Sequence, residues 1–259
     1  MKILFYDWAL HSIGGGQKFN CKIAEYLAKQ GHEIDILTLF PVNKKKLEDY
    51  YSVDISKINI IPLYEKNNIP PTILKLLVST KISKLSEKYG VFFNADAQEI
   101  INPKAKYNIM YCHFFEPKWY RPSRGFIDWL KLSLIYLLKT LKGNYSKKYY
   151  VYCNSEYTKN WLHKLWKINL DNINVIYPPV DIPSKTIFKK ENIILSTGRI
   201  SPDKNYEFVI EVFKQVLKQS SENSLKNYKL YICGKSDDVG YLNKLKSLSK
   251  GLSIEFKTN

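Results

Sequence analysis

The chain has 259 residues, of which 45% are hydrophobic and 14% aromatic, and its formal net charge is +16. These values exclude an intrinsically disordered protein and allow one to two packed domains. The charge indicates a surface that favours anions such as nucleic acid, anionic lipid or phosphorylated substrates, and a lysine-biased composition explains it equally well. Only three basic residues are arginine, namely Arg121, Arg124 and Arg199, so each arginine needs a local reason.

The cysteines and histidines show no metal-binding pattern. The four cysteines lie far apart in or beside apolar segments, without C-x-x-C spacing or a histidine cluster. We therefore expect buried thiols in a reducing compartment, no disulfide framework and no metal. The first residues, MKILFYDWAL, have too short an apolar run for a signal peptide. We interpret them as the first strand of a cytoplasmic protein.

The first forty residues predict a β-α-β unit with a glycine-rich turn. Residues 2–6 form a strand, a loop ends in Gly14, Gly15 and Gly16, a helix follows from about 17 to 30, and 32–39 form a second strand. The turn differs from the dinucleotide fingerprint G-x-G-x-x-G, because the three glycines are adjacent. Either the glycines make a flexible turn, or they let a ligand or the facing domain approach the backbone.

Alternating strands and helices continue through the middle of the chain. We expect helices near 43–51 and 71–88 and strands near 58–63, 91–94 and 107–112. His113 follows the last of these strands directly. Ligands of open α/β sheets collect beyond the carboxyl ends of the strands, so His113 is a candidate site residue.

Residues 126–141, FIDWLKLSLIYLLKTL, are the most apolar stretch of the chain. As a helix they would rise roughly 24 Å, which is short of the roughly 30 Å hydrocarbon core of a bilayer. Two interpretations remain open. The stretch is a core helix packed on the sheet, or it is an interfacial helix whose neighbouring lysines and arginines contact anionic lipid headgroups at the cytoplasmic face of a membrane.

A proline-rich linker follows the first predicted domain. A strand at 149–153, a helix capped by Ser155 that runs through 166, and a strand at 172–177 precede it. Residues 178–191 contain three prolines and several lysines, as is typical of a domain linker. We place the boundary between a first domain, residues 1–183, and a second, residues 184–259.

Residues 191–213, ENIILSTGRISPDKNYEFVIEVF, predict a strand, a polar turn and an amphipathic helix in succession. The apolar run at 193–195 suits a strand covered on both faces, and Ser201 with Pro202 is typical of a helix start. Apolar residues then recur at helical spacing, at Phe208, Val209, Val212 and Phe213. The helix start directs free N–H groups at its ligand and Arg199 and Lys204 lie beside it, so we expect a phosphate there, most simply a diphosphate.

The second domain continues with a strand at 228–233, a helix at 239–250 and a strand at 252–256. Alternating strands and helices throughout predict an α/β fold with parallel sheets in two tandem domains. Three strands leave an open sheet edge in the second domain. We therefore expect this domain to be truncated or completed by another chain.

The turn from Gly198 to Asn205, GRISPDKN, resembles the G-R-x-x-x-[ED]-K-[GN] turn of nucleotide-sugar glycosyltransferases of family 4. These enzymes have the GT-B fold of two facing Rossmann-like domains. The segments YPPVD at 177–181, N-S at 154–155, the glycines at 14–16 and YCHFFEP at 111–117 are similar to further family motifs. All of them occur in the expected order.

The resemblance implies roles for individual residues. Arg199 and Lys204 would bind the donor diphosphate, and His113 would contact the donor sugar through its side chain or its backbone carbonyl. Further donor-binding positions would be Gly14, Gly15, Gly16, Gly198 and Asn205. The family transfers with retention, usually without metal, and the departing diphosphate takes the acceptor proton. The family's glutamate pair, E-x7-E, would lie beyond the third strand of the donor domain.

The resemblance implies transfer of a hexose, with mannose as one candidate, from a nucleotide diphosphate sugar to a glycan or lipid-linked acceptor. No cofactor is expected. One alternative is a non-catalytic or split protein that supplies only the acceptor half and needs a partner for donor binding. A nicotinamide-dependent oxidoreductase is disfavoured by the missing fingerprint, and nucleic-acid binding by the absence of any RNA or DNA motif.

Overall fold

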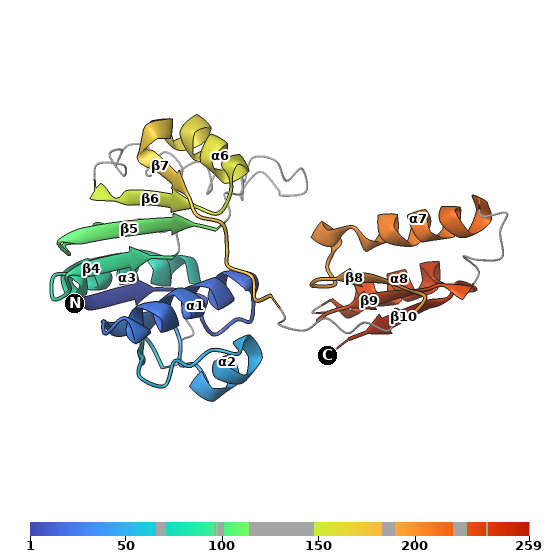
Figure 1. Cartoon of the computed structure of the whole chain (residues 1–259), viewed down its shortest axis with the longest axis horizontal. Coiled ribbons are helices and arrows are strands. Elements are labelled where there is room, and N and C mark those ends of the chain that lie inside the picture. The colour runs from blue at the N-terminus through green and yellow to red at the C-terminus, as the bar shows by residue number, and fades with distance from the viewer. Residues whose placement is uncertain are drawn as a thin grey trace. The chain divides into compact units, whose positions relative to one another are not determined.

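A computed structural model describes residues 1–65, 71–95, 97, 101–113, 148–182, 190–219, 227–236 and 238–258. The chain divides into two compact units, Met1–Asp181 and Ile182–Asn259, and Figure 1 labels most of their elements. The boundary predicted between 183 and 184 lies outside the described residues and stays a prediction. The amphipathic stretch at 126–141 also lies outside them.

The first unit contains a parallel sheet of seven strands in the order β3-β2-β1-β4-β5-β6-β7. The strand order reverses between β1 and β4, which creates the topological switch point at which open α/β sheets bind ligands. The strands are β1 Lys2–Tyr6, β2 Glu33–Thr38, β3 Asn59–Pro62, β4 Val91–Asn94, β5 Tyr107–Cys112, β6 Tyr150–Cys153 and β7 Ile173–Val175.

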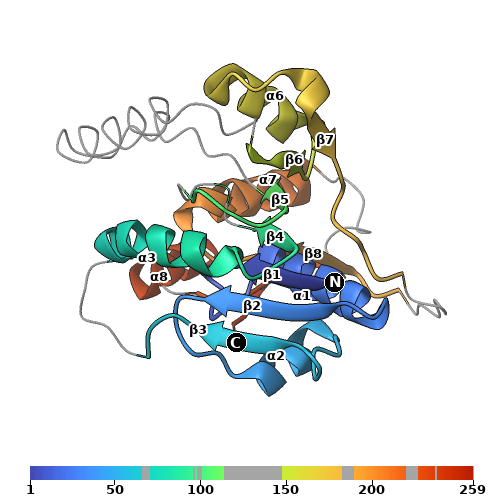
Figure 2. The same cartoon turned by 90° about the vertical axis from the view of Figure 1, so that its left-hand side faces the viewer.

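Helices cover both faces of this sheet. Ile3 and Phe5 of β1 join a core cluster with α1 and α2, whereas Leu4 and Tyr6 join a cluster with α3 and α6. Figure 2 shows α3 on one side of the strands and α1 and α2 on the other. The helices are α1 Gly15–Lys29, α2 Lys44–Tyr51, α3 Pro71–Ser86 and α6 Glu156–Trp166, with a 3-10 turn, η2, at Leu170–Asn172.

The second unit is a parallel sheet of three strands in the order β10-β9-β8. One face carries the core, where Leu230 and Ile232 of β9 pack with residues of the two helices such as Ile210 and Leu245. The elements are β8 Ile193–Thr197, η3 Pro202–Lys204, α7 Tyr206–Gln219, β9 Lys229–Cys233, α8 Val239–Leu248 and β10 Ile254–Lys257. The α/β class and the tandem arrangement are thus confirmed.

The expectation that the strand at 193–195 is covered on both faces is wrong in this structure. Leu195 is 60% exposed and Ile194 is 39% exposed. Leu195 pairs with Tyr231, whereas Ile194 pairs with the core residue Leu230, so Leu195 lies on the face away from the core. Strand β8 is also an edge of the described sheet. An apolar run therefore indicates a strand without revealing what covers it.

The predicted helix start at Ser201 also needs correction. Ser201 caps only the 3-10 turn η3 and makes no side-chain cap hydrogen bond. Asn205 follows in the left-handed conformation, with φ of 51°, and α7 begins at Tyr206. Of the apolar residues expected on the inner face of this helix, Phe213 is buried and Val209 packs against the core, whereas Phe208 is 64% exposed and Val212 is 42% exposed.

Several smaller expectations can be compared directly. No helix in the described ranges is long and apolar enough to cross a membrane. Cys21, Cys112 and Cys153 are buried cysteines outside any disulfide, as expected, and Cys233 is a half-buried one.

Candidate functional site

Polar residues follow neighbouring strands of the first unit where those strands end. Asp7 comes directly after β1, His113 after β5 and Asn154 after β6, and Asn94 is the last residue of β4. Because parallel strands end at the same edge, these residues share one edge of the sheet. That edge includes the switch point between β1 and β4.

The glycine-rich turn is fixed at Gly14 rather than flexible throughout. The hydroxyl of Tyr51, at the end of α2, accepts from the Gly14 N–H at 2.8 Å and donates to the Gly14 carbonyl at 3.1 Å. Desolvation raises the pKa of Tyr51 to about 12, so the hydroxyl keeps its proton at neutral pH. The helix was expected from about residue 17. It begins at Gly15, because extended Gly14 serves as the N-cap.

The backbone at Gly15 is open to a ligand, whereas Gly16 lies next to the ring of His113. A Cβ at Gly15 would meet nothing within 4 Å, and one at Gly16 would lie 3.6 Å from the His113 ring. No side chain caps the start of α1 and its first turn holds no acidic residue. The free N–H groups and the helix dipole therefore favour an anion here.

His113 lies in an aromatic and largely desolvated setting. Its ring makes edge contacts with Phe19 at 5.0 Å and Tyr111 at 4.7 Å between centroids. Burial lowers the pKa of His113 to about 4, so the imidazole is neutral at physiological pH. A neutral imidazole is suited to hydrogen bonding with a hydroxyl and does not supply charge to a phosphate.

Two buried polar residues connect His113 to the end of β1. Asn20 of α1 donates from Nδ2 to Oδ2 of Asp7 at 2.7 Å. The Asn20 Oδ1 atom lies 3.2 Å from Nε2 of His113. The side chain of Asn154 donates to the His113 carbonyl.

The helix that follows β6 holds Asn154 in place. Oδ1 of Asn154 accepts from the Ser155 hydroxyl at 3.0 Å and from the Thr158 hydroxyl at 2.7 Å. Ser155 also accepts from the Thr158 N–H at 3.2 Å, which confirms the predicted N-cap of α6. The donor to the His113 carbonyl is therefore itself fixed by two hydroxyls.

The turn of the second unit exposes its cations on a fixed backbone. Arg199 has a side chain that is 61% exposed and is paired with Asp203 at 3.4 Å, and Lys204 is exposed. Between them, Ile200 is fully buried and its N–H donates to the Lys235 carbonyl at 2.8 Å. The buried Ile200 fixes the backbone while the cations remain available to an anion.

Gly198 and Gly234 bring the ends of β8 and β9 into close backbone contact. The Gly198 N–H donates to the Cys233 carbonyl at 3.0 Å. A Cβ at Gly234 would lie only 1.9 Å from the Gly198 carbonyl oxygen, and Gly234 has φ of +153°. Gly234 is therefore required for packing against the turn that carries Arg199.

The structure groups the predicted residues by unit. Gly14, Gly15, Gly16 and His113 lie together in the first unit, with direct proximity between Gly16 and the His113 ring. Gly198, Arg199, Lys204 and Asn205 lie on one turn in the second unit.

Sequence reasoning missed Asp7, Asn20, Asn154 and Gly234 as contributors to the site. Asp7 directly follows a buried strand, and Asn20 lies one helical turn before the buried Ala24 on the inner side of α1. A polar residue at a core-facing helical position could have indicated Asn20. No local pattern marked the partner of either side chain.

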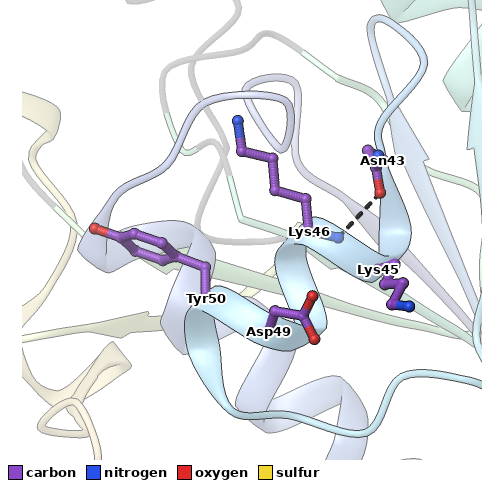
Figure 3. Close-up of a pocket in the computed structure, with 5 residues that line it drawn as sticks. All are labelled: Asn43, Lys45, Lys46, Asp49 and Tyr50. Atoms are coloured by element: carbon purple, nitrogen blue, oxygen red, sulfur yellow. Dashed lines mark hydrogen bonds between the residues drawn. The ribbon is translucent and has the colours of Figure 1, made fainter. Parts of the chain in front are cut away.

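A surface hollow of about 510 Å³ lies beside α2 and contains none of the predicted residues. Figure 3 shows that Asn43, Lys45, Lys46, Asp49 and Tyr50 line it and that their side chains point in different directions. The one hydrogen bond drawn runs from the Lys46 N–H to the Asn43 cap at 3.0 Å. This open surface of a single helix offers no converging polar groups.

Metal binding finds no support among the side chains that the structure describes. Within those residues, no group of three or more His, Cys, Asp or Glu could hold an ion. The expectation of a metal-free reaction stays a prediction.

Curated proteins with similar sequences are named as mannosyltransferases or, more generally, as a glycosyltransferase. A mouse GDP-Man:Man(3)GlcNAc(2)-PP-Dol alpha-1,2-mannosyltransferase is 30% identical over 123 residues, which cover 42% of this chain and 25% of that protein. A Candida glabrata alpha-1,3/1,6-mannosyltransferase is 29% identical over 175 residues, covering 58% and 35%. The chain thus matches about a quarter to a third of the length of these two relatives. An uncharacterised Haemophilus influenzae glycosyltransferase is 23% identical over 262 residues, covering 100% and 68%.

Solved structures share the fold. The lipopolysaccharide glycosyltransferase WaaG superposes with a TM-score of 0.68 at 14% identity, covering 99% of this chain and 70% of that one. Anabaena HepE, solved with UDP and glucose, gives a TM-score of 0.62 at 13% identity, covering 99% and 68%.

Family models account for nearly the whole chain. The model described as Glycosyltransferase Family 4 matches residues 13–183, and the model described as Glycosyl transferases group 1 matches residues 179–259. The chain therefore belongs to glycosyltransferase family 4.

Proposed function

We propose that the protein is a retaining glycosyltransferase that moves a hexose, with mannose as the first candidate, from a nucleotide diphosphate sugar to a glycan or lipid-linked acceptor. The observation that carries this proposal is the pair of exposed cations, Arg199 and Lys204, on a turn held by the buried Ile200. Family membership supports the same conclusion.

Arg199 and Lys204 bind the donor diphosphate in this proposal. The planar guanidinium of Arg199 can hold two phosphate oxygens at once, and Lys204 adds a second positive charge. Negative charge grows on the diphosphate as the glycosidic bond breaks, so cations already in place stabilise the transition state more than the bound donor. One such partner contributes roughly 3 to 4 kcal/mol, or about 100- to 1000-fold in rate.

The first unit supplies the contacts to the sugar. We assign His113 to a sugar hydroxyl because its ring is uncharged at neutral pH, and Gly15 and Gly16 to the close approach of donor atoms. The relatives from mouse and Candida glabrata are named as mannosyltransferases, which supports mannose. The nucleotide and glucose bound to HepE support a nucleotide-sugar donor.

The proposed reaction forms one bond and breaks one bond at the anomeric carbon. An acceptor hydroxyl oxygen bonds to that carbon from the face that the leaving diphosphate vacates, which retains the configuration. The acceptor proton passes to a departing phosphate oxygen. No residue of the chain has to act as a base, and neither a metal nor a cofactor is assigned to the reaction.

A nucleotide-sugar panel tests the proposed activity. The full-length gene product is incubated with GDP-, UDP- and ADP-linked hexoses, and release of the nucleoside diphosphate is measured. Arg199→Ala and Lys204→Ala should each lower kcat/KM by about 100- to 1000-fold. Lys214→Ala is the matched control, since this exposed lysine of α7 is also paired with a carboxylate, Glu211, at 3.9 Å. An active wild type whose release is unchanged in both site variants would contradict the assignment.

We also propose peripheral contact of the protein with an anionic membrane from the cytoplasmic side. This proposal depends only on the sequence of residues 126–141 and the cations around them. Flotation with phosphatidylserine-containing liposomes should carry the protein upward, and deletion of 126–141 should abolish flotation. Wild-type protein that stays with the soluble fraction would remove the membrane proposal without affecting the activity proposal.

A further inference from the structure

A buried carboxylate determines the orientation of the amide next to it. Asp7 is 3% exposed and Asn20 is 2% exposed. Oδ1 of Asp7 accepts from the Ala9 N–H at 3.0 Å, and Oδ2 accepts from Nδ2 of Asn20 at 2.7 Å. A carboxylate only accepts hydrogen bonds, so the NH2 group of Asn20 must face Asp7.

The orientation of Asn20 in turn determines which nitrogen of His113 carries a proton. With its NH2 group facing Asp7, Asn20 presents Oδ1 to Nε2 of His113 at 3.2 Å. An amide oxygen only accepts, so Nε2 must be the donor. The pKa of His113 is lowered to about 4 by burial, so the neutral ring has a single proton and Nδ1 keeps its lone pair.

The surroundings of the ring hold this arrangement in place. Phe19 and Tyr111 contact the ring edge-on, and the backbone of Gly16 packs against it. The Nδ1 atom has no hydrogen-bond partner within the described part of the chain. The His113 carbonyl, by contrast, already accepts from Asn154.

We propose that Asp7 and Asn20 are positioning residues that lock His113 as the Nε2–H tautomer, so that Nδ1 accepts from a hydroxyl of the donor sugar and repels a phosphate oxygen. The identity of this hydroxyl rests on the proposed function, whereas the tautomer does not. The proposal also chooses between two ways in which His113 could contact the sugar. We take the side chain as the ligand group because Nδ1 accepts no hydrogen bond within the described residues, whereas the carbonyl oxygen already accepts one from Asn154.

Nitrogen NMR of the intact chain tests the tautomer without any substrate. The protein is labelled with ¹⁵N-histidine, and two-bond ¹H–¹⁵N correlations distinguish protonated from unprotonated ring nitrogens. The His113 signals are assigned as those lost in His113→Gln. At pH 7 we expect a protonated Nε2 and an unprotonated Nδ1. A proton on Nδ1 in the wild type would overturn the proposal.

Asp7→Asn should reverse the tautomer. The new side chain can still accept from Ala9 through Oδ1, but it now presents an NH2 group to Asn20. The Asn20 amide must turn over and give its own NH2 group to Nε2, which moves the His113 proton to Nδ1. An unchanged tautomer in folded Asp7→Asn would overturn the proposal. Asn20→Ala is a second variant, and both tautomers should be populated in it.

Asp35→Asn is the matched control. Asp35 is also a buried carboxylate, 7% exposed, and it accepts from Nδ2 of Asn59 at 3.2 Å. The His113 tautomer should not change in this variant, and a reversal there would mean that general destabilisation explains the effect.

Inorganic phosphate tests the selectivity of Nδ1. Raising phosphate to tens of millimolar at pH 7 should leave both His113 nitrogens unchanged, and protonation of Nδ1 by bound phosphate would overturn the proposal. Failure of the nucleotide-sugar panel would leave these spectra as they are. Failure of the tautomer proposal would leave the predicted loss of activity in Arg199→Ala and Lys204→Ala unchanged. The two proposals can therefore fail separately.

Discussion

The turns that follow β1 and β8 have the same place in their units, and glycine has a different use at each. Each follows the first strand of a parallel sheet and leads into a helix. At Gly15 an added Cβ would meet open space, whereas at Gly234, which packs against the Gly198 turn, it would lie 1.9 Å from a carbonyl oxygen. Gly15 in the first turn thus leaves space for a ligand. Gly234, beside the second turn, lets two backbone segments pack together.

The two turns also differ in charge. The first lies beside the neutral imidazole of His113, which is hydrogen-bonded to the Asn20 amide, and this amide is hydrogen-bonded to the Asp7 carboxylate. The second exposes Arg199 and Lys204. This difference suggests a division of work among the side chains, in which Arg199 and Lys204 of the second turn neutralise the diphosphate and His113, beside the first turn, recognises uncharged groups. Four predictions test this division.

The largest effect should come from Gly234→Ala. Its Cβ would clash with the Gly198 carbonyl at a φ of +153°, so we expect a loss of roughly 3 to 5 kcal/mol in unfolding free energy. Urea denaturation followed by circular dichroism measures it. Gly251→Ala is the control, since φ there is +77° but no atom lies within 4 Å, and its cost should be about 1 to 2 kcal/mol. Equal losses in both variants would show that backbone contact with Gly198 is unimportant.

The second effect is a pH dependence due to His113. Its folded pKa of about 4 lies below the ordinary value of 6.5, so the unfolded chain binds more protons between these values. Stability should therefore fall as pH decreases from about 6.5 to 4, by about 2 to 3 kcal/mol from this residue. In His113→Gln, this part of the fall in stability with decreasing pH should be absent. His163→Gln, at an exposed histidine of α6, should keep it, and identical slopes in all three proteins would refute the assignment.

A smaller effect is expected from Arg199→Lys, which separates charge from geometry in the second turn. The positive charge remains but the two-point grip on phosphate is lost. We expect kcat/KM for nucleoside diphosphate release to fall roughly tenfold, as one charge-assisted hydrogen bond contributes about 1.5 kcal/mol or more. Stability should not change, because the side chain is 61% exposed. A loss as large as that of Arg199→Ala would mean that charge alone contributes nothing.

The last prediction is a small gain in stability from Gly15→Ala. No atom lies within 4 Å of the new Cβ, and alanine favours a helix over glycine, so stability should rise by up to about 1 kcal/mol. The KM for the donor should nevertheless rise, because the methyl group occupies space left for a ligand. A stable variant with unchanged KM would show that the donor does not approach this turn.

Much of the fold could be predicted from local pattern. The bounds of β1, β4 and β5 agree with the predicted strands, because apolar runs bounded by polar residues suffice to mark strands that helices cover on both faces. The cap at Ser155 was predictable because it depends on residues only three apart. The start of α7 was not predictable, since the left-handed Asn205 interrupts the helix that Ser201 was expected to start.

By itself the sequence determined the α/β class, the order of the elements and the GRISPDKN turn, since each depends on residues that are close along the chain. The tertiary structure alone decided what surrounds His113. Asp7 follows β1, Asn20 lies in α1 and His113 follows β5, and 93 residues separate Asn20 from His113. Only the parallel pairing of β1, β4 and β5 brings them to one sheet edge. Because their polar groups are buried at that edge, these residues satisfy them by hydrogen bonding to one another.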